Sequence, residues 1–217
     1  SNVPSGLGQS FSNFTWNCTS QSQDLNLSGA LTTVNGNLLI ASTGSKELVL
    51  SENTYNLTVG GNFVQSGGLV ELNDKSSTVN WNLGGNFTQT GRTLTTKAGG
   101  AAKITFTKSG TQNYTQSGTV SNIDFEVKAG TGLDVGTSIM TGKNFTLNAG
   151  SSLYIASASG ISASGGTGNI QVSDTRFFSK EANYIYDGTV AQVTGTGLPA
   201  TVNNLQINNS AGLTLST

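Results

Sequence analysis

The sequence predicts an all-β fold, a parallel β-helix or β-solenoid, and three observations lead to this prediction. A pair formed by Asn and a large apolar residue recurs about every 25 residues along the 217-residue chain. Between these pairs, short runs alternate apolar and polar residues with the period of two that is typical of β-strands. Gly and Asn separate the runs, and no window shows helical spacing. A period of this length is typical of stacked arrays, in which one unit cannot bury its apolar face alone.

The Asn–apolar pair occurs eight times and defines eight repeats. The pairs are Asn13-Phe14, Asn37-Leu38, Asn62-Phe63, Asn86-Phe87, Asn113-Tyr114, Asn144-Phe145, Asn169-Ile170 and Asn204-Leu205. We expect each repeat to form one coil with three short strands, and the chain to form about eight coils. The apolar partners would line one interior column. Parallel crossovers favour a right-handed winding.

The alternation of apolar and polar residues is clearest in three strand-like runs. Their apolar members are Val79, Trp81 and Leu83, then Ile104 and Phe106, then Ile123, Phe125 and Val127. Side chains two residues apart on a strand share a face, so these residues would point into the core. The residues between them are polar, and we expect them to face solvent.

The repeated Asn has a physical role at a corner between strands. Asn tolerates left-handed backbone conformations and bonds to nearby backbone, and stacked Asn side chains can form a ladder. Glycines directly before several of these Asn residues are consistent with a tight corner. Gln65, Gln89 and Gln116 each follow the corner Asn by three residues. We interpret them as a second polar stack, on the solvent side.

We expect residues 1–217 to form a single β-solenoid, with regular coils in 1–118 and irregular coils in 119–217. Longer turns would lie at Ala129–Lys143, Ser157–Gly168 and Phe178–Leu198, since extra residues in a solenoid go into loops. Such loops are where a solenoid would carry a specific binding feature. The chain ends inside a strand-like run, so we expect it to be a segment of a longer array.

The composition argues against several classes of function. The net charge is −1 and no Lys/Arg cluster occurs, so we expect no nucleic-acid partner. No apolar run approaches the roughly 18 residues of a membrane span. The chain has no His, and its acidic residues form no column at equal repeat positions. We therefore expect no enzyme, with no catalytic, cofactor-binding or metal-binding residues.

A few residues suit a functional site, but each of them also suits a plainer structural role. Asp124 and Glu126 share a strand face that we interpret as solvated, and we interpret Asp174 and Arg176 as a surface ion pair. Cys18 fills a slot of small residues, which favours a packed thiol. Tyr154, Tyr184 and Tyr186 are weak candidates for binding sugars, and they equally suit a core. Outward Thr rows, namely Thr93, Thr95, Thr105 and Thr107, leave ice binding as a minor option.

Several phrases of the sequence resemble a known class of repeat. They are Leu31–Asn37, Val59–Phe63, Gly84–Gly91 and Gly197–Leu205. These phrases resemble the β-strand-repeat regions of large secreted and cell-surface proteins of Bacteroidetes, which typically end in a type IX secretion sorting domain. The resemblance covers most of the chain, although its motifs are degenerate. It implies an extracellular or cell-surface, adhesin-like or filament-like role and assigns no site residue.

Together these features predict a non-enzymatic structural or adhesive segment of an exported bacterial surface protein or filament. End-to-end self-association and contact with surface glycans are the partners we expect. The alternative is a carbohydrate-active β-helix module, either polysaccharide-binding or lyase-like. Ice binding is a third and weaker alternative.

Overall fold

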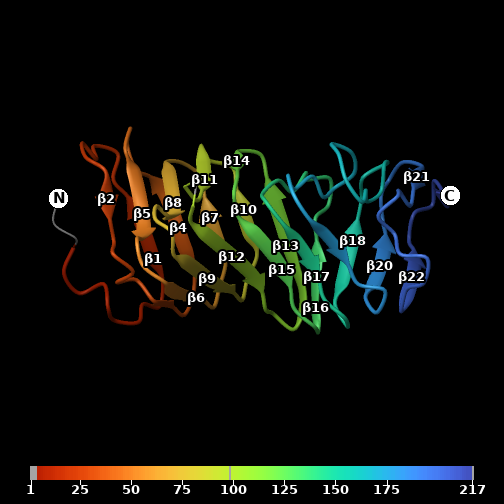
Figure 1. Cartoon of the computed structure of the whole chain (residues 1–217), viewed down its shortest axis with the longest axis horizontal. Coiled ribbons are helices and arrows are strands. Elements are labelled where there is room, and N and C mark those ends of the chain that lie inside the picture. The colour runs from red at the N-terminus through yellow and green to blue at the C-terminus, as the bar shows by residue number, and fades with distance from the viewer. Residues whose placement is uncertain (1–3, 98, 217) are drawn as a thin grey trace. The chain divides into compact units, whose positions relative to one another are not determined.

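The computed structural model describes residues 4–97 and 99–216, and it contains no helix among them. The chain divides into two compact units. The first unit consists of Ser1–Thr105 and Gln116–Asp124, and the second consists of Phe106–Thr115 and Phe125–Thr217. In each unit, parallel strands stack as successive coils of a β-solenoid (Figure 1). The predicted fold class is confirmed, with about nine turns where about eight were predicted. The right-handed winding stays a prediction.

The first unit contains three parallel sheets, so each regular coil has the three short strands that the repeat predicts. The first sheet holds β1 (Phe14–Asn17), β4 (Leu38–Ser42), β7 (Phe63–Gln65) and β10 (Phe87–Gln89). The second holds β2 (Leu25–Asn26), β5 (Glu47–Ser51), β8 (Leu69–Asn73), β11 (Thr93–Thr95) and β14 (Thr119–Val120). The third holds β3 (Thr33–Val34), β6 (Tyr55–Val59) and β9 (Thr78–Leu83), and β12 (Ala101–Phe106) runs across the sequence boundary between the units.

The second unit is less regular than the first. One sheet holds β13 (Gly110–Gln116), β16 (Thr131–Asp134), β18 (Ser152–Ile155), β20 (Asn183–Tyr186) and β22 (Asn204–Ile207). Another holds β15 (Asp124–Val127), β17 (Phe145–Leu147) and β19 (Arg176–Phe178). Besides these sheets, the described part of the second unit contains the pair β21 (Gln192–Val193) and β23 (Leu213–Thr214) and the isolated bridges Met140–Ile170 and Ile161–Gly168.

The first four repeats stack in the register that the Asn–apolar pairs predict. Phe14 pairs with Leu38, Leu38 with Phe63, and Phe63 with Phe87. Leu38, Phe63 and Phe87 are buried, and the rings of Phe63 and Phe87 lie 5.3 Å apart. The ring of Trp81 meets Phe63 edge-on at 4.8 Å from the opposite side of the coil. An interior column of large side chains therefore forms the core of the first unit.

The corner Asn residues form a ladder in which side chains bond to backbone. The backbone N–H of Asn37 donates to Oδ1 of Asn13 at 2.8 Å, and that of Asn62 donates to Oδ1 of Asn37 at 2.9 Å. The N–H of Asn86 continues the series, donating to Oδ1 of Asn62 at 2.8 Å. A corner Asn inside the ladder therefore donates its backbone N–H to the Asn of the preceding coil, and its side-chain oxygen accepts the same kind of hydrogen bond from the Asn of the following coil.

In the first unit, the glycines before the corner Asn are required for close approach and not for a left-handed backbone, whereas Gly168, before Asn169 in the second unit, has a φ of +77°. Gly36, Gly61 and Gly85 have ordinary φ values, and outside glycine only Ser28 and Asn122 of the described residues have positive φ. A Cβ added to Gly61 would lie 2.6 Å from the backbone carbon of Gly36, and one added to Gly85 would lie 2.3 Å from that of Gly61. Stacked corners leave no room for a side chain at this position.

The prediction that Gln65, Gln89 and Gln116 stack on the solvent side is wrong. Gln65 and Gln89 are fully buried, and Gln116 is half-buried. They lie two residues after the interior aromatic residue, and the period of two places them on the same inner face. Their Nε2 atoms donate to backbone carbonyls inside the coil, for example Gln65 to Thr93 at 2.9 Å.

In the second unit, the predicted column of Asn–apolar pairs is also wrong. Phe145 lies in β17 and pairs with Phe125, and Ile170 bridges to Met140, so neither lies in the sheet of β13 and β16. Leu205 lies in that sheet, in β22. Residues inserted between the later pairs shift the pair to a different corner, and the motif alone does not identify which corner it occupies.

Two of the three long turns predicted for this half contain strands. Ala129–Lys143 includes β16, and Phe178–Leu198 includes β20 and β21. Ser157–Gly168 is irregular, with an antiparallel bridge between Ile161 and Gly168 as its one β-interaction among the described residues. Short strands such as Thr-Gly-Leu-Asp in β16 lack the β-branched alternation that signals a strand.

Candidate functional site

The three tyrosines proposed from the sequence occupy different environments. Tyr184 and Tyr186 are fully buried, and their hydroxyls donate to backbone carbonyls, Tyr184 to Ser179 at 2.8 Å and Tyr186 to Thr194 at 2.7 Å. Burial raises the pKa of both phenols. Tyr154 is half-buried on the outer face of β18. Tyr184 and Tyr186 are therefore core residues that present no face to a sugar.

An aromatic side chain that was not proposed from the sequence lies in the open instead. Phe177 is 53% exposed, on the outer face of β19. It borders a hollow of about 570 Å³. The other lining residues are Asn148, Ala149, Phe178, Ser179, Lys180 and Glu181. This hollow, at the ends of β17 and β19, is the candidate functional site.

The strand that carries Phe177 is held firmly from the inside. The ring of its neighbour Phe178 packs against Phe145 at 5.7 Å. On the other side of Phe177, the guanidinium of Arg176 donates to the backbone carbonyls of Ser162 and Val172 at 3.0 and 3.1 Å, and also to that of Gly165. Consecutive side chains of a strand point to opposite faces, so these two contacts fix Phe177 outward.

The turn that follows β19 is also fixed by hydrogen bonds. The N–H of Ala182 donates to the carbonyl of Ser179 at 3.2 Å, and the N–H of Gly150 donates to that of Glu181 at 3.0 Å. The buried hydroxyl of Tyr184 donates to the same Ser179 carbonyl. Tyr184, proposed from the sequence as a binding residue, thus supports the turn beside the hollow from within.

Arg176 does not form the predicted surface ion pair. Among the described residues, no ion pair joins it to Asp174. Its guanidinium instead holds the irregular segment 162–172 through carbonyl oxygens, and partial burial lowers the pKa of Arg176. The positive charge next to two aromatics was visible in the sequence, but its true partners are backbone atoms that a sequence motif does not reveal.

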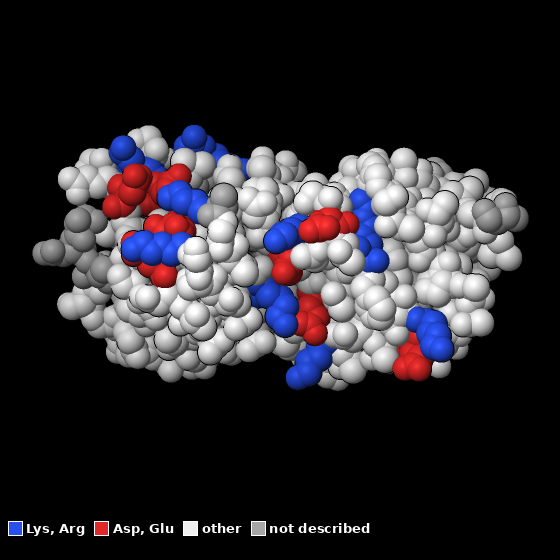
Figure 2. All heavy atoms as spheres, viewed as in Figure 1, with Lys and Arg blue, Asp and Glu red and all other residues white. Residues whose placement is uncertain are grey.

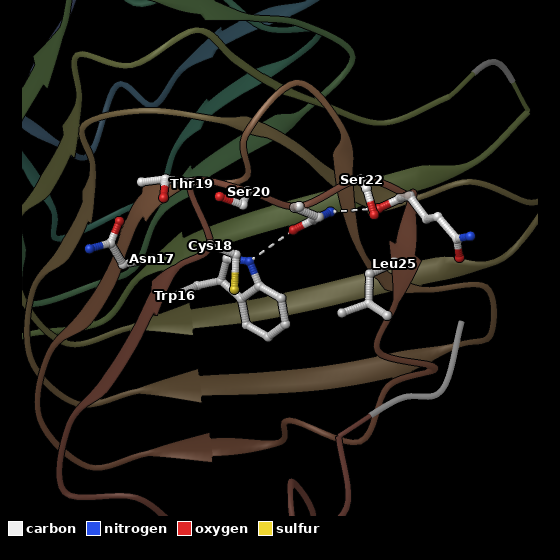
Figure 3. Close-up of a pocket in the computed structure, with 9 residues that line it drawn as sticks. Trp16, Asn17, Cys18, Thr19, Ser20, Ser22 and Leu25 are labelled. Atoms are coloured by element: carbon white, nitrogen blue, oxygen red, sulfur yellow. Dashed lines mark hydrogen bonds between the residues drawn. The ribbon is translucent and has the colours of Figure 1, made fainter.

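A second hollow, of about 560 Å³, lies beside β1 and the loop that follows it. Figure 3 shows the indole of Trp16, the thiol of Cys18 and the side chain of Leu25 among the residues that line this hollow. The indole N–H donates to Oε1 of Gln21 at 3.2 Å, and Nε2 of Gln21 donates to the carbonyl of Glu47 at 2.8 Å. These bonds tie the loop to the next coil.

Cys18 is free and exposed, so the prediction of a packed thiol is wrong. The register of β1 against β4 shifts between Trp16 and Asn17, which carries Cys18 out of the slot of small residues. The slot itself exists in the later coils, where a Cβ on Gly91 would lie 2.6 Å from the backbone nitrogen of Gly67.

A cluster of charged side chains ties successive coils together in the first unit, and Figure 2 shows acidic and basic side chains gathered over it. Nζ of Lys97 lies 2.9 Å from Oε2 of Glu71 and 3.6 Å from Oε2 of Glu47, and Lys75 pairs with Glu52. Burial raises the pKa of the Glu71 carboxyl, and the hydrogen bond from Lys97 opposes that shift. We interpret this cluster as a structural clamp across coils.

The sequence carries a signal for this cluster of charged side chains. Asp24, Glu47, Glu71 and Lys97 each follow a corner Asn by about ten residues, in four successive repeats. Residues at similar repeat positions lie on adjacent strands, so charges of both signs there predict ion pairs between coils.

The row of Thr93 and Thr95, one of those that leave ice binding as an option, continues only in part to the neighbouring coils. Thr93 pairs with Leu69 on one side and Thr119 on the other, and Thr95 lies beside Glu71. Asp124 and Glu126 share one face of β15, as predicted, but both are half-buried there and not fully solvated. Oε1 of Glu126 accepts a hydrogen bond from Asn148 at 2.9 Å.

The chain matches no protein-family model, no curated protein and no solved structure. In the described part of the chain, no helix has the length and apolar character needed to cross a membrane.

Proposed function

We propose that this chain is a non-enzymatic structural and adhesive segment of an exported bacterial surface protein or filament. The observation that carries the proposal is the ladder of Asn13, Asn37, Asn62 and Asn86. In this ladder the same hydrogen bond, from a backbone N–H to a side-chain oxygen, joins each coil to the next. Such a stack can be lengthened by adding coils without any new kind of contact. Reach and rigidity are the properties that this design provides.

The bacterial and extracellular setting rests on the sequence phrases described above, such as Gly84–Gly91, which resemble exported Bacteroidetes repeats. The low proportion of charged residues, 10%, and the abundance of Gly suit a long repetitive surface protein. The surface carries both polar rows and isolated exposed apolar side chains, which supports a role in contact with other surfaces.

The terminal strands support end-to-end self-association with a second copy of the chain. Among the described strands, β1 and β22 each pair on one side only, which leaves backbone donors and acceptors on the other edge. Ile207, on β22, is 53% exposed, and Leu215 nearby in sequence is 64% exposed. Open edges with apolar side chains are templates for pairing with another strand.

We therefore expect the purified chain to associate as its concentration rises. Sedimentation velocity should show species heavier than the monomer, and electron microscopy of negatively stained samples should show linear assemblies. Ile207→Lys places a charge at the open edge and should shift association to higher concentration by about tenfold or more. Ile139→Lys, at a residue that is 47% exposed in a loop before β17, is the matched control and should leave association unchanged.

A chain that stays monomeric at every concentration, or associates equally well in both variants, would contradict the edge-pairing model. Cleavage of a polysaccharide by the purified chain would contradict the non-enzymatic assignment and favour the lyase-like alternative. The polysaccharide-binding form of that alternative has a specific observation in its favour, namely the exposed Phe177 beside a hollow that several polar side chains help to line.

A further inference from the structure

Phe177 stands apart from the other exposed apolar side chains. The large apolar residues exposed in the described chain are Ile139, Phe177, Val190, Val193, Ile207 and Leu215, and Phe177 is the one aromatic among them. An aromatic ring offers a flat, rigid apolar face with only two side-chain torsions to fix. Binding sites for small molecules characteristically combine such a surface with a few placed polar groups.

The polar groups lie in the same hollow. Asn148 lines it from the end of β17, and Ser179, Lys180 and Glu181 line it from the turn after β19. The carboxylate and the ammonium balance, so the hollow carries no net charge that would select a charged ligand. Hydroxyl, amide and charged groups beside one ring suit a ligand rich in hydroxyl groups with an apolar face, which describes a pyranose sugar.

A polar row extends from the ring across the outer face of the sheet. Phe177 pairs with Thr146, and Thr146 pairs with Glu126, so the three side chains follow one another on adjacent strands. Parallel strands lie about 4.8 Å apart, so this row provides one contact group per coil. A chain of sugars running along the row would meet the ring first and then a hydroxyl and a carboxylate.

The site is also preorganised. Phe178 packs against Phe145 inside the coil, and the guanidinium of Arg176 is hydrogen-bonded to backbone carbonyls. The buried hydroxyl of Tyr184 donates to a carbonyl of the turn after β19. A ligand therefore finds the ring already outward, and little conformational entropy is lost on binding. A broad apolar patch would suit a protein partner better, but this surface is one exposed ring beside a hollow that Asn148, Lys180 and Glu181 help to line.

We propose that the hollow at Phe177 binds a neutral polysaccharide, with the ring stacked on a sugar and with Thr146 and Asn148 as hydrogen-bonding contacts. The inference rests on the adhesive role proposed above and assigns its contact site. Tyr184 is a positioning residue, since its hydroxyl reaches the turn and not the hollow.

The test is affinity electrophoresis of the whole chain in native gels. Neutral probes are a mixed-linkage β-glucan, hydroxyethylcellulose and a galactomannan, and polygalacturonate is the acidic comparison. We expect at least one neutral probe to retard the chain, and Phe177→Ala to raise its dissociation constant about tenfold. Phe177→Trp should retain binding. Ile139→Ala, which removes an exposed apolar side chain from a different hollow, should bind as the natural chain does.

Circular dichroism should show unchanged strand content in every variant, because Phe177 contributes little to the core. The proposal is overturned if no neutral probe retards the chain, if Phe177→Ala binds undiminished, or if Ile139→Ala loses binding equally. Retardation by polygalacturonate alone would also overturn it. The association experiment with Ile207→Lys does not involve Phe177. Failure of glycan binding would therefore appear in the electrophoresis alone, and failure of the proposed self-association would appear in the association experiment alone.

Discussion

Replacing Gly85 by alanine should destabilise the first unit by about 3 kcal/mol, because the added Cβ meets backbone that cannot move aside. The Cβ would lie 2.3 Å from the backbone carbon of Gly61, 2.4 Å from its oxygen and 2.6 Å from the nitrogen of Asn62. All three are backbone atoms of the adjacent coil, so relief requires the coils to separate at the corner. The Asn62–Asn86 bond of the ladder lies beside this contact and would lengthen with it.

Urea unfolding followed by tryptophan fluorescence measures this effect in the appropriate unit, because Trp16 and Trp81 both lie in the first one. Gly8→Ala is the matched control, since nothing lies within 4 Å of a Cβ at Gly8 and its φ is not positive. The control should unfold within about 0.5 kcal/mol of the natural chain. Equal stability of the two variants would show that the corners do not stack as described.

The second large effect is expected at Phe63, whose truncation to alanine should cost about 3–5 kcal/mol. The ring is 1% exposed and lies 4.8 Å from that of Trp81 and 5.3 Å from that of Phe87. A solenoid coil has a narrow interior, and the stacked coils on both sides hinder collapse around the cavity. The lost burial and the residual cavity therefore add to one another.

Phe63→Leu is the comparison that separates lost volume from lost aromatic geometry. It keeps most of the apolar volume and should cost less than about 1.5 kcal/mol by the same fluorescence measurement. If Phe63→Ala costs no more than Phe63→Leu, the interior column is not the main source of stability in this unit.

The sequence predicted the first four coils well because the spacing between their corner Asn residues is nearly constant. Residues at equal repeat positions then fall on adjacent strands, as Phe63 and Phe87 do. The second unit was predicted less well, since insertions place Asn144 and Phe145 at another corner. A local motif does not show how many extra residues the preceding turn contains, so it does not show which corner it occupies.

The error over Gln65 and Gln89 has a different cause. Their polarity suggested solvent, but the period of two places them inside beside Phe63 and Phe87. Their Nε2 atoms are accommodated by coil carbonyls that appear only once the chain is closed. In a narrow solenoid, periodicity is a better guide to burial than side-chain polarity.

The candidate site was missed for a reason that the sequence could have supplied. Two consecutive aromatics on a strand must face opposite sides, so one of Phe177 and Phe178 had to point outward. Tyr184 and Tyr186 share one face, two residues apart, and both face the core of their coil. Which face is inner could not be decided for β19 until its partner Phe145 was known.

The in-register parallel stack is the central claim, and a disulfide between neighbouring coils tests it most directly. Val64 and Thr88 are register partners on the outer face of β7 and β10, so their Cα atoms lie within disulfide range. In a Cys18→Ser background, Val64→Cys with Thr88→Cys should form an intramolecular disulfide under mild oxidation, detected by mass and by peptide mapping. Thr15→Cys with Thr88→Cys lies in the same column but three strands apart, and it should remain reduced within one molecule. Failure of the first pair to close, or equal closure of the second, would contradict the stacked-coil account.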